Sequence, residues 1–182
     1  PGRSPRPGRW TMDEAEAHRL AGHAAFQQAD WPAALTAYTA GVKAREASGA
    51  PPDRRLFSNR CAAWMAQAKT LSAAAGVLAA DGRPDGETRG EAVEAAARAV
   101  RDATRCVKTD GGWPKSWHRL YTALVAAGRA DDAVAALERG CVACPGDPDL
   151  FRAAAEAGVV VGGGGGRRSG GRRRDARCGS AG

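Results

Sequence analysis

Apolar residues along the chain recur at intervals of three and four positions, which is the spacing of one face of an α-helix. The pattern runs from about Asp13 to Gly158 through an alanine-rich stretch that lacks strand-like alternation. Proline, glycine and aspartate interrupt it, so the pattern predicts short antiparallel helices joined by turns. The five interruptions are Ala29-Asp30-Trp31-Pro32, Pro51-Pro52-Asp53, Gly111-Gly112-Trp113-Pro114, Gly128-Arg129-Ala130-Asp131 and Pro145-Gly146-Asp147-Pro148. At the first of them, Asp30 is suited to cap a helix and Pro32 to lie in its first turn.

A repeat underlies these helices. The segment ADWPAALTAYTAG aligns with GRADDAVAALERG, so that Ala34 matches Ala133 and Gly41 matches Gly140. Ala99 takes the same slot between them, 34 residues before Ala133. A spacing of about 34 residues is the period of tetratricopeptide repeats. Ala34 precedes Ala99 by 65 residues, which leaves room for one period and an insertion.

The insertion falls at about residues 68–93. We expect residues 66–80 to extend a helix, 81–90 to form a polar loop, and 91–109 to form the returning helix. Small residues at the repeat slots let paired helices approach closely, while the interior is filled by larger side chains: Tyr38, Trp64, Trp117, Leu124 and Leu137.

The fold class that follows is all-α. A single helix hairpin cannot bury its apolar face, so stability requires several stacked repeats and a terminal cap. We expect three hairpins in a right-handed α-solenoid, closed by a C-terminal capping helix. The expected ranges, with the domain as a whole at 12–158, are repeats at about 14–47, 54–109 and 113–146 and a capping helix at 147–158.

The net charge of +7 belongs to the two ends of the chain. Residues 1–10 hold three arginines and no acid, residues 162–182 hold six arginines and one aspartate, and the rest holds 18 basic and 19 acidic residues. A basic nucleic-acid groove on the folded part is therefore not expected. We expect a disordered basic arm at 1–11 and a disordered Gly/Arg-rich tail at 159–182. The tail leaves a weak contact with RNA as one alternative.

Two basic pairs and one amide are the candidate binding residues. Arg19 and His23 stand four positions apart and so share a helix face, and Lys115 and Arg119 repeat that spacing. Asn59 lies on the helix between them. Like charges at this spacing disfavour a helix, so the pairs make sense where an anion sits among them. The alternative is that all of them are ordinary solvated residues.

The motifs around these residues resemble the carboxylate-clamp tetratricopeptide domains of Hsp-organising (stress-inducible) co-chaperones. The resemblance covers Glu14 to about Ala157 and implies an adaptor that grips the C-terminal Glu-Glu-Val-Asp of the seventy- or ninety-kilodalton heat-shock chaperones. It rests on Gly22-His23-x-x-Phe26, Asp30-Trp31-x-x-Ala34-Leu35-x-x-Tyr38-Thr39, Phe57-Ser58-Asn59-Arg60-x-Ala62-Ala63-Trp64 and Trp113-x-Lys115-x-x-x-Arg119.

The resemblance places the clamp on Arg19, His23, Asn59, Lys115 and Arg119. Arg19 replaces the usual lysine, and His23 replaces the usual asparagine with a bulkier ring. A neutral imidazole can still donate one hydrogen bond, and a carboxylate bound beside it would favour the protonated ring. We therefore expect binding weaker than in the family and tighter toward pH 6. The second alternative is a scaffold for another partner, with a degenerate clamp.

No catalytic site, cofactor site, small-molecule site or membrane span is expected. The histidines stand in no nucleophile or metal motif, and the five-glycine run opens no helix. Cys141 and Cys144 form a CxxC, but the two further ligands of a structural zinc site are missing, so buried thiols are expected. Five scattered cysteines do not form a secreted disulfide framework, which predicts a cytoplasmic protein.

Overall fold

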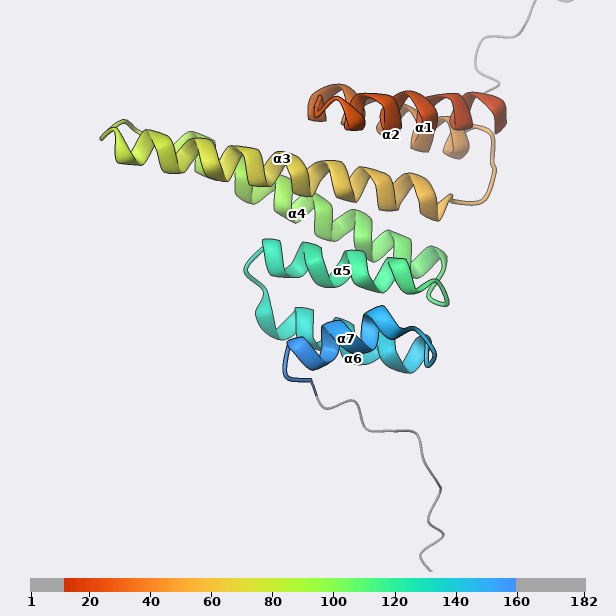
Figure 1. Ribbon diagram of the computed structural model, residues 1–182. Coiled ribbons are helices and arrows are strands. Elements are labelled where there is room, and N and C mark those ends of the chain that lie inside the picture. Colours follow the sequence, from red (N-terminus) through yellow and green to blue (C-terminus); the bar gives the residue numbers. More distant parts are fainter. Residues whose placement is uncertain (1–11, 160–182) are drawn as a thin grey trace, which may run out of the picture.

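The computed structural model describes residues 12–159, and that range contains seven α-helices and no strand (Figure 1). Consecutive helices pack against one another, so three hairpins stack in chain order and the last helix covers the end of the stack. This is the all-α solenoid predicted from the sequence. The helices are α1 (Met12–Gln27), α2 (Trp31–Ala47), α3 (Arg54–Ala80), α4 (Gly86–Thr109), α5 (Pro114–Ala126), α6 (Ala130–Ala143) and α7 (Pro148–Glu156).

Aspartates at the interruptions begin three of the helices. The Asp30 carboxylate accepts the backbone N–H of Ala33 at 3.0 Å, and Pro32 lies in the first turn of α2, as the sequence predicts. Asp53 caps α3 and Asp147 caps α7 in the same manner. Each cap satisfies one N–H that the first turn of a helix cannot pair by itself.

Small residues occupy the contact points between paired helices. Ala34, Ala99 and Ala133 are all buried. A Cβ at Gly41 would lie 2.9 Å from Leu56, and one at Gly140 would lie 2.9 Å from Trp117, so neither site tolerates a larger residue without movement. This close approach is the physical reason for the repeat that the sequence shows.

Two main apolar clusters form the core. One joins α1 and α2 to the start of α3 around the buried Tyr38, and the other joins α4 to α7 around the buried Trp117. Leu124 and Leu137 are buried in the second cluster, as expected. Trp64 is half-buried and packs against both clusters and against a small third one of Ala68, Ala95 and Ala96. The aromatic residues therefore act as core, in agreement with the sequence.

A buried ion pair joins α3 to α4. Arg60 donates two hydrogen bonds to the Asp102 carboxylate, each of 2.7 Å, and a third to Thr39 on α2 at 3.3 Å. Both side chains are largely buried, at 12% and 6% exposure. Removing one partner of such a pair leaves an uncompensated buried charge, so the pair fixes α3 against α4, while the Thr39 bond links α3 to the first hairpin.

The insertion lengthens both helices of the second hairpin, which projects beyond the stack (Figure 1). The expected polar loop at 81–90 is shorter, because α4 begins at Gly86 rather than at residue 91. Arg89 binds Asp85 one turn earlier, and Glu87 is an acid in the first turn, where the helix dipole favours it. These contacts offset the two glycines, Gly86 and Gly90, that suggested a loop.

At the ends of the described chain, α1 begins at Met12 and α7 ends at Glu156. Val159, expected to begin the tail, donates its backbone N–H to Ala154 at 2.8 Å and packs on the core. The disorder expected for residues 1–11 and 160–182 lies outside the described residues, as does the tail on which the RNA alternative rests. Within the described range, no helix has the length and apolarity that a membrane span requires.

Candidate peptide-binding site

The five candidate residues lie on three of the seven described helices. Arg19 and His23 are on α1, Asn59 is on α3, and Lys115 and Arg119 are on α5. Helix α3 contacts both α1 and α5, so the helix that carries Asn59 lies against the two helices that carry the basic pairs. We call Arg19 and His23 the α1 half, and Lys115 and Arg119 the α5 half.

The α1 half already holds a carboxylate. Arg19 donates from Nε and Nη2 to the two oxygens of Glu16, at 2.9 and 2.6 Å. A two-point contact of this kind is the strongest geometry for a guanidinium and a carboxylate. Hydrogen bonding by Arg19 lowers the pKa of Glu16, and the nearby charge of Arg55 lowers it further.

Arg55 adds a cation that the sequence analysis did not select. It lies on α3 one turn before Asn59, and its Nη2 is 3.7 Å from Glu16 and 3.0 Å from Asp53. Just over half of its side chain is exposed. The acid three residues before Arg19 and the base four residues before Asn59 are the two signals that could have revealed this network.

The two uncharged hydrogen-bonding candidates, His23 and Asn59, differ in how much of the side chain is exposed. His23 is exposed, and its Nε2 lies 3.3 Å from the side-chain nitrogen of Gln27. Asn59 is half-buried between the Arg55 turn and the core. Both can donate a hydrogen bond to an oxygen acceptor, although only Asn59 is held close to the packed surface.

The α5 half holds no carboxylate among the described residues. Lys115 is exposed, with Nζ 5.8 Å from the centre of the Trp113 ring. Arg119 is half-buried, and its Nε is buried without a hydrogen-bond partner in residues 12–159. A buried N–H without a partner costs about 1–3 kcal/mol, so this guanidinium would be stabilised by an incoming oxygen.

Arg119 lies close enough to two buried cysteines, Cys61 and Cys106, for its charge to act on them. Burial raises the pKa of Cys61 to about 12, and the positive charge of Arg119 opposes that rise. Burial likewise raises the pKa of Cys106 to about 11. These thiols are therefore protonated and unreactive at neutral pH.

Comparison with known proteins agrees with this architecture. Residues 114–157 match the family model described as Tetratricopeptide repeat. The first TPR of Spaghetti (RPAP3), bound to the HSP90 peptide SRMEEVD, superposes with a TM-score of 0.56 at 17% identity, over 81% of this chain and 94% of that one. The chain has the fold of a tetratricopeptide-repeat domain.

Two further tetratricopeptide structures cover the same range. The second TPR domain of human RPAP3, in complex with the HSP70 peptide SGPTIEEVD, gives a TM-score of 0.55 at 18% identity, over 80% of this chain and 96% of that one. The TPR2B domain of yeast Sti1, in complex with pHsp70, gives 0.55 at 24% identity, over 80% and 97%. No curated protein matches the sequence significantly.

The remaining cysteine motifs of the described chain are structural. Cys61, Cys106, Cys141 and Cys144 are free and buried, so the CxxC consists of packed thiols, as expected. Within residues 12–159 no three His, Cys, Asp or Glu side chains gather closely enough to hold a metal ion. Cys178 lies outside the described residues.

Proposed function

We propose that this tetratricopeptide domain is a co-chaperone adaptor that binds the acidic C-terminal peptide of a seventy- or ninety-kilodalton heat-shock chaperone. The observation that carries the proposal is the α5 half, where the half-buried Arg119 keeps an Nε without a hydrogen-bond partner in residues 12–159 and the exposed Lys115 lies over the Trp113 ring. Solved tetratricopeptide domains of the same fold hold peptides that end in Glu-Glu-Val-Asp. An adaptor of this kind binds its partner and catalyses no reaction. Its buried thiols suit the reducing cytoplasm.

The chemistry of the site suits an extended peptide with two or more carboxylates. Lys115 offers a point charge, and Arg119 offers a planar set of N–H donors, one of them unpaired. The carboxylates of the peptide would bind Lys115, Arg19 and Asn59, with His23 as a further donor. Arg119 would bind a carboxylate or a backbone carbonyl further from the terminus.

The Glu16 contact supports carboxylate binding in the α1 half. Arg19 there binds an acidic side chain through two hydrogen bonds. The Glu16 side chain is 42% exposed, although that of Arg19 is only 19% exposed. A peptide carboxylate that reaches Arg19 therefore competes with Glu16 for it.

The test is a fluorescence-anisotropy titration of the full chain with a peptide that ends in Met-Glu-Glu-Val-Asp. We expect micromolar affinity, lost when the same peptide is C-terminally amidated and lost in Lys115→Ala. The matched control is Lys43→Ala, which removes an exposed lysine from α2 and should leave binding unchanged. Equal binding of the free and amidated peptides would refute the clamp.

A second candidate is a scaffold with a degenerate clamp for another partner. It is favoured by the internal occupation of Arg19 and by the exposed His23 in place of an asparagine. In that case neither peptide binds, while circular dichroism shows the helical fold intact. If the free peptide binds the Glu16→Gln variant but not the parent chain, Glu16 is the residue that closes the site.

A further inference from the structure

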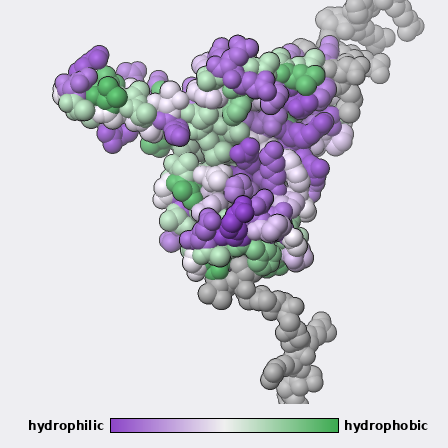
Figure 2. Space-filling view, in the orientation of Figure 1, coloured by the Kyte–Doolittle hydropathy of each residue, from purple (hydrophilic) through white to green (hydrophobic). Residues whose placement is uncertain are grey.

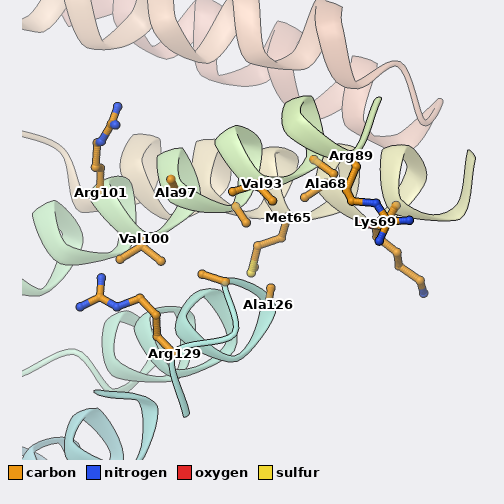
Figure 3. Close-up of a pocket in the computed structure, with 14 residues that line it drawn as sticks. Met65, Ala68, Lys69, Arg89, Val93, Ala97, Val100, Arg101, Ala126 and Arg129 are labelled. Atoms are coloured by element: carbon orange, nitrogen blue, oxygen red, sulfur yellow. The ribbon is translucent and has the colours of Figure 1, made fainter. Parts of the chain in front are cut away.

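The projecting hairpin forms a groove with the end of α5. The groove has a volume of about 630 Å³ and lies between the inner faces of α3 and α4 and the turn that follows α5. Figure 3 shows Met65 pointing from α3 toward Ala126, with Val100 and Arg129 closing one side. Much of the wall belongs to residues 68–93, so the insertion creates this groove.

The floor of the groove is apolar and made of small side chains. Val93 in its wall is 66% exposed, an unusual exposure for a valine in a helix that packs on its neighbours. Figure 2 shows weakly apolar surface where the hairpin meets the body. Small residues let another backbone approach closely, and a methionine adapts its shape to whatever binds. The alanines that line it are Ala68, Ala92, Ala96, Ala97, Ala126 and Ala127.

The rim is positively charged. Of the described residues that line the groove, four are basic and none is acidic; the basic ones are Lys69, Arg89, Arg101 and Arg129. Three of the four pair with acids outside the lining, namely Asp85, Glu94 and Asp132. These arginines are more than half exposed, and exposed pairs of this kind exchange readily for another carboxylate. Lys69 has no such pair among the described residues.

The shape suits a helix. On α4 the lining residues recur at three- and four-residue spacing from Arg89 to Arg101, a stripe of about 18 Å, or about three helical turns. An apolar groove between helices is the usual receptor for an amphipathic partner helix. Residues 1–10 and 162–182 of this chain are themselves basic, so the charged rim disfavours them and favours an acidic segment of a partner.

We propose that this groove, named the hairpin groove, docks an acidic amphipathic helix of a partner protein. The apolar face of that helix lies on the alanine floor against Met65 and Val93, and its flanking carboxylates bind Lys69, Arg89, Arg101 and Arg129. The groove shares no residue with the candidate clamp. The domain thereby binds two acidic ligands at separate sites. The insertion supplies the second of these sites.

The probe is a synthetic, capped helix of about four turns with leucines at three- and four-residue spacing between glutamates. The chain has only two methionines, Met12 and Met65, so methyl-labelled methionine gives two NMR signals, one of which lies in the groove. We expect the Met65 signal to shift on titration, the Met12 signal to stay, and a dissociation constant of about 10–100 µM at low salt. Lys115→Ala should leave this binding unchanged.

Two matched valine variants locate the site. Val93→Glu places a carboxylate in the groove and should weaken binding at least about tenfold. Val77→Glu makes the same change at a position of similar exposure, 63%, on the same hairpin outside the groove, and should change nothing. Both sites are exposed, so both variants fold.

Four outcomes would overturn the proposal. They are no shift of Met65 at millimolar peptide, equal binding of a probe with lysines in place of glutamates, equal effects of the two valine variants, and binding lost with Lys115→Ala. Sedimentation gives one more test. If the chain dimerises and Val93→Glu abolishes the dimer, the hairpin groove holds a second copy and the acidic partner is wrong.

Discussion

The two halves of the candidate clamp carry similar basic residues, but among the described residues the arginine is ion-paired in one half and not in the other. In the α1 half, the Arg19 guanidinium is bound to Glu16, with Arg55 close by. In the α5 half, Lys115 is exposed and Arg119 keeps a buried N–H without a partner in the described chain. The same chemistry is therefore engaged in the α1 half and open in the α5 half.

Local sequence explains the difference. Glu16 stands three residues before Arg19, where a helix brings the two side chains together. The residues three and four positions from Lys115 and from Arg119 are glycine, alanine, histidine, serine, threonine and each other, so no acid can reach them along α5. A single acid placed one turn away decides whether a basic residue is available to a ligand.

The largest effect is expected at Arg119. Arg119→Ala removes the unpaired N–H and the charge together, and should weaken binding of the Met-Glu-Glu-Val-Asp peptide about 100-fold, which corresponds to about 2.7 kcal/mol. Arg119→Lys keeps the charge without the planar donors and should lie between Arg119→Ala and the parent chain. Titration calorimetry at constant salt measures all three. Unchanged affinity in Arg119→Ala would place the peptide away from α5.

The next effect concerns the acid of the α1 half. Glu16→Gln frees Arg19 from a charged partner and should raise peptide affinity several-fold, about 3–10 times, because the peptide no longer competes with an internal carboxylate. Glu138→Gln, at an exposed acid on α6, is the control and should have no effect. A fall in affinity for Glu16→Gln would mean that Glu16 orients Arg19 for the peptide instead of competing with it.

The repeat made most of the fold predictable. The interruptions at Asp30, Asp53 and Asp147 are visible as caps, and the slots at Ala34 and Gly140 are visible as close contacts, because both depend on residues near in sequence. The loop of the insertion was predicted too long. Glycines favour a loop locally, whereas the packing of α4 on α3 favours a helix, and that packing cannot be read from either segment alone.

For the candidate site, the sequence selects residues but does not show their surroundings. Spacing and resemblance selected Arg19, Asn59 and Lys115, yet gave no sign that Arg55 approaches Glu16 from another helix. The Arg60–Asp102 pair was missed for the same reason, since its partners are 42 residues apart. The hairpin groove also depends on how α5 sits beside the insertion. All three features depend on contacts between segments that are far apart in the sequence, and such contacts cannot be read from local patterns.

A smaller effect follows from the pKa of Asp53. Burial raises this pKa, but hydrogen bonds and the charge of Arg55 outweigh burial, and the net direction is down. A lowered pKa stabilises the fold above the unfolded value of about 3.9 and loses that effect as pH falls through the folded value. Asp53→Asn should lower Tm by about 1–3 °C at pH 7 and by nothing near pH 2. A pH-independent difference in thermal melts would contradict this.

The smallest effect is expected at His23. Its side chain is exposed and lies within hydrogen-bond distance of Gln27 on the same helix, so its removal should barely alter the free protein. In the complex, a carboxylate beside the ring favours the charged imidazolium, so affinity should rise about twofold between pH 8 and pH 6. His23→Asn supplies an amide donor without a charge, so its affinity should stay flat over that range. Calorimetry at both pH values compares the two chains. A pH-dependent affinity that persists in His23→Asn would assign the proton to another group, and a flat affinity in the parent chain would place His23 outside the α1 half that the peptide touches.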